Sequence, residues 1–177
     1  MLSGKYIGIK AIEREDLGQM LHWRNNPQFR QFFREYRELN LKNQEYWFEN
    51  IVQKDQNMIM FSIVDLKNDN LLGACGFCYI NWVNRNAEFS LYIGDSNVYI
   101  DQKFAPDAGN VLIKYGFNEL NLHRIYAEAF DFDKLKQGLL KSLKFQLEGR
   151  HRETQWSNGQ WYDSLVFGLL KRDIIIK

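Results

Sequence analysis

Residues 87–117, AEFSLYIGDSNVYIDQKFAPDAGNVLIKYGF, decide the fold of this chain. An apolar strand from Ala87 to Ile93 leads through a polar loop into an amphipathic helix, which is expected to begin near Asp107. A second apolar strand, HRIYAEAF, follows at 123–130. Because a crossover helix joins parallel strands in a right-handed sense, we expect the two strands to be parallel neighbours. The helix start then directs its unpaired N–H groups beyond the first strand, a corner that suits a ligand with a pyrophosphate.

The composition is that of a globular protein with little net charge. Of the 177 residues, 45% are hydrophobic and 15% aromatic, and the net charge is +1. This length corresponds to one domain, expected to span 1–177. The small net charge argues against nucleic acid and an anionic membrane as partners, and no apolar run approaches the roughly 20 residues that span a bilayer. The first residues, MLSGKYIGIKAI, lack the apolar core of a signal peptide, so we expect a cytoplasmic protein.

The two cysteines form a C-x-x-C pair, Cys75 and Cys78, inside the apolar run LLGACGFCYI. Redox motifs of this spacing work at a helix start, whereas this run is typical of a buried strand. Residues three apart on a strand point to opposite faces, so the thiols cannot easily share a metal. Zinc would need further ligands, and His22, His123 and His151 show no matching spacing. We therefore expect two reduced, buried cysteines and no metal site.

Hydrophobic periodicity and turn residues predict the order βααβββαβαββ. Turns at Lys67–Asn70 and Ser157–Gly159 mark hairpins. The predicted fold class is α/β, with a mixed, mostly antiparallel sheet flanked by helices. The expected strands are Tyr6–Ile12, Met58–Leu66, Leu71–Asn81, Arg85–Ile93, Arg124–Phe130, Gln146–Trp156 and Trp161–Lys171. The expected helices are Arg14–Asn25, Lys42–Lys54, Asp107–Leu120 and Asp133–Leu143.

This order and several local phrases carry a resemblance to a known family. The phrases are LHWRNNP at 21–27, AEFSLYIGD at 87–95, LIKYGFNELNLHRIYAEAF at 112–130, FQLEGRHRE at 145–153 and NGQWYDSLVFGLL at 158–170. The chain resembles the GNAT superfamily of N-acetyltransferases, in the branch that acetylates ribosomal-protein N-termini and amino sugars. The resemblance covers nearly the whole chain.

The resemblance implies a single GNAT-like domain whose two strands splay apart at their C-terminal ends and admit the pantetheine arm of acetyl-CoA. It implies direct transfer of an acetyl group from acetyl-CoA, the co-substrate, to a primary amine, without a metal. The acceptor would be an amino sugar, an aminoglycoside-like small molecule or a peptide or protein N-terminus, and the protein a monomer or homodimer. A catalytically degenerate GNAT fold that serves as a binding or scaffold module is the alternative.

By resemblance, the backbone of Leu91, Tyr92 and Ile93 would bond the donor and the substrate, and a backbone N–H would stabilise the oxyanion. Glu88, on the same strand, is the candidate for ordering a water or accepting the proton of the amine. A solvated strand carboxylate is the alternative for Glu88. Tyr162 lies where family members approach the donor sulfur, and a structural cross-strand pair is its alternative.

The segment expected to hold the pyrophosphate departs from the family pattern. Where the family has the glycine-rich Gln-Gly-x-Gly-x-Ala, this chain reads IDQKFA at 100–105. Glycines let successive N–H groups approach phosphates closely, whereas Asp101 adds a repelling charge. Lys103 compensates in part as a point charge. Together with Phe104 and Ala105, Lys103 remains the candidate contact to the donor.

A second donor motif departs as well. By resemblance, the pattern Asn-x-x-Ser…Gly-Phe falls on Asp133, Lys136, Lys144 and Phe145, and the late Tyr of a variant falls on Leu140. Asp133 would then contact the donor, and Lys136 would serve as the acid that protonates the leaving thiolate. Either the chain binds acyl-CoA through altered contacts or it has lost the donor.

The acceptor side is expected at the end of the first helix, Trp23-Arg24-Asn25, and in the segment RQFFREYR at 30–37. In the resembling enzymes this region lines the acceptor cleft. A solvated helix face with an aromatic core stripe is the alternative. A phosphate or carboxylate of the acceptor would be gripped through a bidentate fork by Arg24, Arg34 or Arg37.

Overall fold

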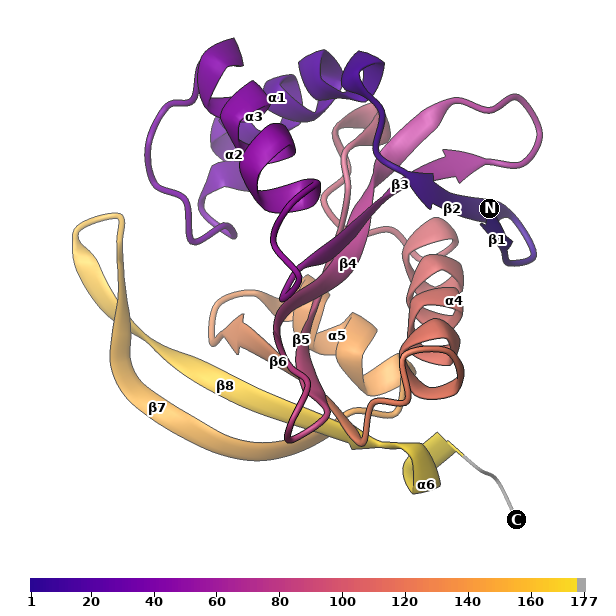
Figure 1. Cartoon of the computed structure of the whole chain (residues 1–177). Helices are drawn as coiled ribbons and strands as arrows, with labels where there is room; N and C mark the ends of the chain where they lie inside the picture. Colours follow the sequence, from indigo (N-terminus) through magenta and orange to yellow (C-terminus); the bar gives the residue numbers. More distant parts are fainter. Residues whose placement is uncertain (175–177) are drawn as a thin grey trace.

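The computed structural model describes residues 1–174, which form an eight-stranded sheet of order β1-β2-β3-β4-β5-β6-β8-β7 (Figure 1). The strands are β1 (Leu2–Ser3), β2 (Ile7–Ala11), β3 (Ile59–Asp65), β4 (Leu71–Asn81), β5 (Asn86–Ile93), β6 (Arg124–Phe130), β7 (Gln146–Ser157) and β8 (Gln160–Leu170). The helices are α1 (Leu17–Asn25), α2 (Pro27–Arg30), α3 (Leu41–Trp47), α4 (Phe104–Asn118), α5 (Lys134–Ser142) and α6 (Lys171–Ile174). The predicted fold class is confirmed. The domain limits 1–177 stay a prediction, and their last three residues lie outside the described chain.

β5 and β6 form a parallel pair that separates after its first three ladder positions. The last paired residues are Glu88 and Tyr126, although β5 continues to Ile93 and β6 to Phe130. Beyond that point β6 keeps β8 as its antiparallel partner and β5 keeps β4. The two strands are therefore parallel neighbours that diverge at their C-terminal ends, as predicted.

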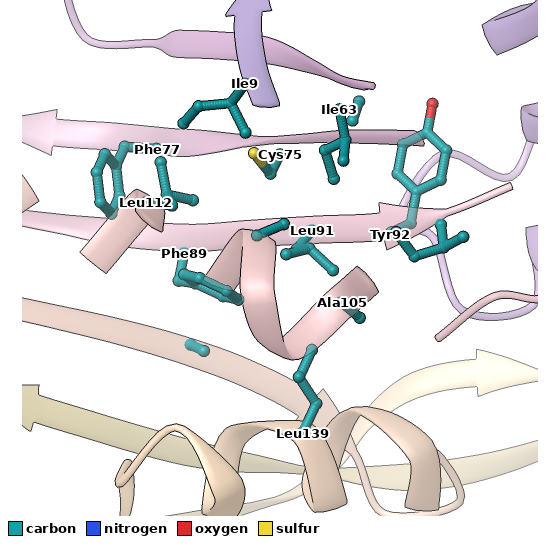
Figure 2. Close-up of a cluster of buried hydrophobic side chains, with 14 of the residues drawn as sticks. Ile9, Ile63, Cys75, Phe77, Phe89, Leu91, Tyr92, Ala105, Leu112 and Leu139 are labelled. Carbon is teal, nitrogen blue, oxygen red and sulfur yellow. The ribbon is translucent and has the colours of Figure 1, made fainter. Parts of the chain in front are cut away.

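Side-chain alternation along β5 separates two layers of helices. Figure 2 shows Phe89 and Leu91 on the side of α4, and the Phe89 ring lies 5.6 Å from that of Phe145 between centroids. Tyr92 packs instead against α1, where its ring lies 6.3 Å from that of Trp23. Helices α4 and α5 thus cover one face of the sheet, while α1, α2 and α3 gather on the other (Figure 1).

Helix α4 begins at Phe104, about one turn before the expected start at Asp107. The carboxylate of Asp101 accepts the N–H groups of residues 103–105 at 3.2, 2.9 and 2.7 Å. A side-chain acceptor that satisfies the free N–H groups fixes where a helix starts. The expected boundary was wrong because it overlooked this cap. Asp107 turns to the start of β2, where its carboxylate accepts the N–H groups of residues 5–7.

The two cysteines are free thiols on opposite faces of β4. Cys75 is fully buried in the core toward α4 (Figure 2). Cys78 is half-buried and lines the cavity described below, so the expectation that both are buried was wrong for Cys78. Burial raises the pKa of the Cys78 thiol to about 11, which makes it a weak nucleophile.

Several short elements had no signal in the sequence. β1, α2 and α6 are too short to show a hydrophobic period. The predicted helix Lys42–Lys54 is divided into α3 and a π-helical turn, Phe48–Val52. No helix within residues 1–174 is long and apolar enough to cross a membrane.

The close approach of β4 and β5 can be tested at Gly73, where a Cβ atom would lie 2.2 Å from the carbonyl oxygen of Tyr92. We expect Gly73→Ala to lower the free energy of unfolding by about 1–3 kcal/mol in urea denaturation, because the backbone must shift. Gly138→Ala in α5 is the control, since a Cβ atom there meets nothing within 4 Å. It should raise the free energy of unfolding by roughly 0.5–1 kcal/mol. An unchanged value for Gly73→Ala would contradict the close approach.

Candidate active site

A cavity of about 230 Å³ opens where β5 and β6 separate. Its walls come from both strands at and beyond the split, from the first turn of α5, and from the chain between α1 and α3. The residues that matter for its chemistry are Arg24, Arg34, Glu88, Leu91, Tyr92, Tyr99, Glu128, Asp133 and Lys136.

An arginine joins two carboxylates at the start of the split. Arg34 Nη1 donates to Glu88 Oε2 at 2.8 Å, while Nη2 donates to Glu88 Oε1 and, at 2.8 Å, to Glu128 Oε2. Glu88 stands on β5 and Glu128 on β6. The Glu88 side chain is only 7% exposed, whereas that of Arg34 is 48% exposed. The hydrogen bonds to Glu88 raise the pKa of the Arg34 guanidinium, so the guanidinium keeps its charge.

Lys136 brings an ammonium group to the cavity from the first turn of α5. The helix starts here because the Asp133 carboxylate accepts the Lys136 N–H at 3.0 Å. The side chain is half-buried and lines the cavity. Burial lowers the pKa of the Lys136 ammonium, although the charges of Glu88 and Asp133 oppose the shift. An ammonium with a lowered pKa is a better proton donor near neutral pH.

β5 offers a backbone donor to the split. On the side that faced β6, β5 has no strand partner beyond Glu88. The N–H of Ile93 points to that side, where it donates to the carbonyl of Tyr99 at 2.9 Å. Because alternate N–H groups of a strand point to the same side, the N–H of Leu91 also faces the split. It is placed to meet an oxygen atom of a ligand that enters there.

The buried Tyr99 side chain connects the loop after β5 to the start of α5. The ring of Tyr99 stacks on that of Phe32 with 4.4 Å between centroids. Its hydroxyl donates to the Asp133 carboxylate at 3.3 Å. Burial raises the pKa of both groups, so the hydroxyl stays protonated. This bridge holds the far end of the split in place.

The helix start expected to hold a pyrophosphate is filled by an anion of the chain itself. The N–H groups of residues 103–105 are bonded to Asp101, as described above. The ammonium of Lys103 lies over the rings of Tyr6 and Phe104, at 5.0 and 4.1 Å from their centroids. None of the residues 101–105 lines the cavity. The helix start and the cavity are separate parts of the site.

The structure brings half of the predicted site residues together. Around the cavity lie Glu88, Leu91, Tyr92, Asp133, Lys136, Arg24 and Arg34. Outside it lie Ile93, Lys103, Phe104, Ala105, Tyr162, Trp23 and Asn25. The functional roles assigned to all of these residues stay predictions.

Three of the outlying residues have structural contacts. Trp23 is 3% exposed and belongs to the core. Asn25 exchanges two hydrogen bonds with the backbone of Leu39, at 2.7 and 2.9 Å, and thereby closes the irregular segment between α2 and α3. Tyr162 packs edge-on against Phe132 at 4.6 Å between centroids.

Two further residues of the cavity, Glu128 and Tyr99, were not predicted from the sequence. Glu128 interrupts the apolar strand RIYAEAF, and a carboxylate in such a strand is a signal for a functional or paired group. Tyr99 is one of nine tyrosines and gave no comparable signal. Only the fold, which places Tyr99 beside Asp133, indicates that it belongs to the site.

The chain is similar in sequence to known acetyltransferases. The acetyltransferase (GNAT) domain family matches residues 9–166. The uncharacterized N-acetyltransferase p20 of Bacillus licheniformis is 38% identical over 113 residues, which cover 64% of this chain and 62% of that protein. The alignment thus spans less than two thirds of that relative. The spermidine N(1)-acetyltransferase of Escherichia coli strain K12 is 27% identical over 166 residues, 93% of this chain and 86% of that protein.

Solved structures share the fold over nearly the full length. The spermidine N-acetyltransferase of Vibrio cholerae in complex with CoA and spermine superposes with a TM-score of 0.86 at 26% identity, covering 94% of this chain and 96% of that one. A dodecameric structure of the Vibrio cholerae enzyme gives a TM-score of 0.80 at 27% identity, with 96% of each chain covered. The split sheet places the protein in the N-acetyltransferase fold class. By the family match, the chain belongs to the acetyltransferase (GNAT) domain family.

The helix cap can be tested by stability. Asp101→Ala should lower the free energy of unfolding by about 1 kcal/mol, because the N–H groups at the start of α4 lose their acceptor. The control is Gln102→Ala, whose side chain is exposed and whose effect should stay within about 0.5 kcal/mol. Equal denaturation midpoints for the two variants would show that Asp101 does not cap the helix.

Proposed function

We propose that this protein is an acetyl-CoA-dependent N-acetyltransferase that transfers the acetyl group to a primary amine by direct attack. The observation that carries the proposal is the split between β5 and β6, whose cavity holds a buried carboxylate and an ammonium of lowered pKa beside a free strand edge. Family membership and the CoA complex of the Vibrio relative support acetyl-CoA as co-substrate.

Acetyl-CoA would place its thioester in the split. The N–H of Leu91 would donate to the thioester carbonyl and stabilise the oxyanion that forms there. The pantetheine arm would follow the free edge of β5 past Tyr92. Its pyrophosphate would reach the start of α4 and replace Asp101 as the acceptor for the N–H groups of residues 103–105. Asp133 would contact the donor at the opposite wall.

The chemistry requires one proton to leave the ammonium of the acceptor before attack. Glu88, directly or through a water, takes this proton, and the neutral nitrogen adds to the thioester carbonyl. The C–S bond then breaks, and the CoA thiolate receives a proton from Lys136. The new amide nitrogen releases its remaining extra proton to solvent. The products are the N-acetylated amine and CoA.

The charges around the cavity favour an acceptor with positive charge. Four acidic residues, Glu35, Glu88, Glu128 and Asp133, line it against three basic ones, Arg24, Arg34 and Lys136, and complementary charge selects among partners. Amino sugars and aminoglycoside-like compounds meet this condition. So does spermidine, the amine in the names of the Escherichia coli and Vibrio cholerae relatives. A peptide N-terminus is the other acceptor class in the proposal.

Other properties of the proposal concern partners and location. The net charge of +1 supports a protein that binds neither nucleic acid nor an anionic membrane, and we place it in the cytoplasm. We propose a monomer or homodimer. The dodecameric structure mentioned above is that of the Vibrio cholerae enzyme.

A binding module without catalysis is the second candidate function. The loop IDQKFA at 100–105 favours it, because the family glycines are missing and Asp101 occupies the helix start. A module of this kind would bind an amine and no CoA thioester. Calorimetry of the purified protein with acetyl-CoA separates the two candidates. Binding supports the enzyme, and no binding at millimolar ligand supports the module.

Acetyl transfer itself is tested by following CoA release from acetyl-CoA with a panel of amines: spermidine, an aminoglycoside, an amino sugar and a short peptide with a free N-terminus. The proposal expects amine-dependent release of CoA and an N-acetylated product by mass spectrometry. Release of CoA at the same rate with and without every amine would contradict it.

Removing the competing anion should strengthen donor binding. Asp101→Asn keeps one oxygen acceptor for the helix start and loses the charge that repels phosphate, so acetyl-CoA should bind more tightly by about 1–3 kcal/mol. Asp95→Asn removes an exposed charge nearby and is the matched control, with little expected change. If calorimetry finds equal affinity for wild type and Asp101→Asn, Asp101 does not compete with the pyrophosphate.

The acid role of Lys136 predicts a loss of turnover without a loss of folding. Lys136→Met should lower kcat by on the order of 100-fold or more, the range of a lost general acid, and Lys136→Arg should not restore it because guanidinium is a poor proton donor. Methionine should keep the thermal stability, since burial disfavours the charged form of Lys136. A kcat within threefold of wild type would remove Lys136 from the mechanism.

A further inference from the structure

We propose that the guanidinium of Arg34 is a built-in occupant of the site for the acceptor ammonium, which an incoming amine must displace. Arg34 would then decide which amines are accepted. The inference rests on the proposed function for its kinetic consequences, whereas its binding test needs no acetyl-CoA.

Arg34 connects the two strands where they begin to separate. Arg34 bonds Glu88 on β5 and Glu128 on β6. Glu88 is the last residue of β5 that pairs with β6. On β6, the last residue that pairs with β5 is Tyr126, and Glu128 lies two residues beyond it. The guanidinium therefore lies between the two strands at the start of the split, where the proposed reaction brings the amine nitrogen to the thioester.

Glu88 is buried, whereas its partner Arg34 is partly exposed. The Glu88 carboxylate is 7% exposed, and a buried carboxylate requires a cation or hydrogen-bond donors. The Arg34 side chain is 48% exposed, so it can leave toward solvent at lower cost. A substrate ammonium that replaces it exchanges one cation for another and leaves Glu88 paired. A neutral or anionic acceptor offers no such exchange.

The Arg34 side chain can move while its backbone stays in place. Arg34 belongs to the segment 31–40, which has no helix or strand. Its neighbours are anchored, because Phe32 stacks on Tyr99 and Phe33 packs on Tyr92 with 5.3 Å between ring centroids. Besides its bonds to the two carboxylates, the guanidinium of Arg34 lies over the ring of Tyr79, with 5.9 Å between its central carbon and the ring centroid. We therefore expect a rotation of the Arg34 side chain to open the site.

The same contacts argue against Arg34 as an anchor for an acidic group of the acceptor. Both of its terminal nitrogens already donate to carboxylates. An anion that approached them would meet the charges of Glu88 and Glu128. Among residues 1–174, Arg24 has no carboxylate within ion-pair distance. It is therefore the better anchor for such a group.

Displacement of a bidentate arginine also predicts selectivity among amines. The fork donates to both carboxylates at once, and a single ammonium on a short chain is a weaker replacement. An amine with two positive charges can pair with Glu88 and Glu128 together. Arg34 therefore favours polycationic acceptors over monoamines.

The experiment compares amine binding to wild type, Arg34→Gln and Arg34→Lys by calorimetry without acetyl-CoA, using propylamine, 1,4-diaminobutane and spermidine as probes. Arg34→Gln should bind all three more tightly, by on the order of tenfold, and the gain should be largest for propylamine. Arg34→Lys should show a smaller gain, because lysine lacks the fork. Arg30→Gln, which removes a neighbouring arginine paired with Glu38, should match wild type.

Every result of these binding measurements supports or contradicts the proposed role of Arg34. Equal or weaker amine binding in Arg34→Gln and Arg34→Lys would overturn it, even if the wild type acetylates amines. If Arg34→Gln does not fold, the direction of the change in Arg34→Lys decides. Tighter amine binding in a protein that shows no acetyl transfer would support the role of Arg34 and contradict the proposed function. In an active enzyme, Arg34→Gln should also lower the KM for propylamine more than that for spermidine.

Discussion

The separation of β5 and β6 is the constraint on which the rest of the site depends. Two parallel strands that stop pairing after Glu88 and Tyr126 leave the facing backbone N–H and C=O groups without strand partners in the middle of a sheet. Buried groups of this kind must be satisfied by protein, water or a ligand. The hydrogen bond from Tyr99 to Asp133 links the segments that follow the two strands, and the gap between the strands is part of the folded state.

Two charged side chains of the chain stand where the proposed substrates carry charge. Asp101 occupies the helix start that would receive a pyrophosphate, and Arg34 occupies the place of an ammonium. Each contact satisfies groups that would be costly to leave unpaired in the free protein. The same contacts weaken substrate binding, because every substrate contact must replace an existing one. This exchange explains how a site with altered donor motifs keeps a stable fold.

The fold was largely predictable because strand alternation, crossover connectivity and hairpin turns are local signals. The start of α4 was not, since Asp101 looked like a liability toward phosphate and its capping role depends on loop geometry. At the site, Glu88, Lys136 and Arg34 were selected from the sequence, and the structure places them around one cavity. Glu128 was missed because its meaning depends on Arg34, which is 94 residues away in the chain. The pairing of an arginine with both carboxylates is a tertiary property that no sequence window contains.

In the proposed mechanism, acetyl-CoA enters the gap and bonds the free edge of β5. Amide hydrogen exchange at Leu91 measures this most directly, because its N–H faces the gap while that of Ser90 faces β4. The account predicts that the Leu91 amide exchanges faster than that of Ser90 in the free protein and slows markedly with saturating acetyl-CoA. An exchange rate at Leu91 that does not respond to acetyl-CoA would contradict it.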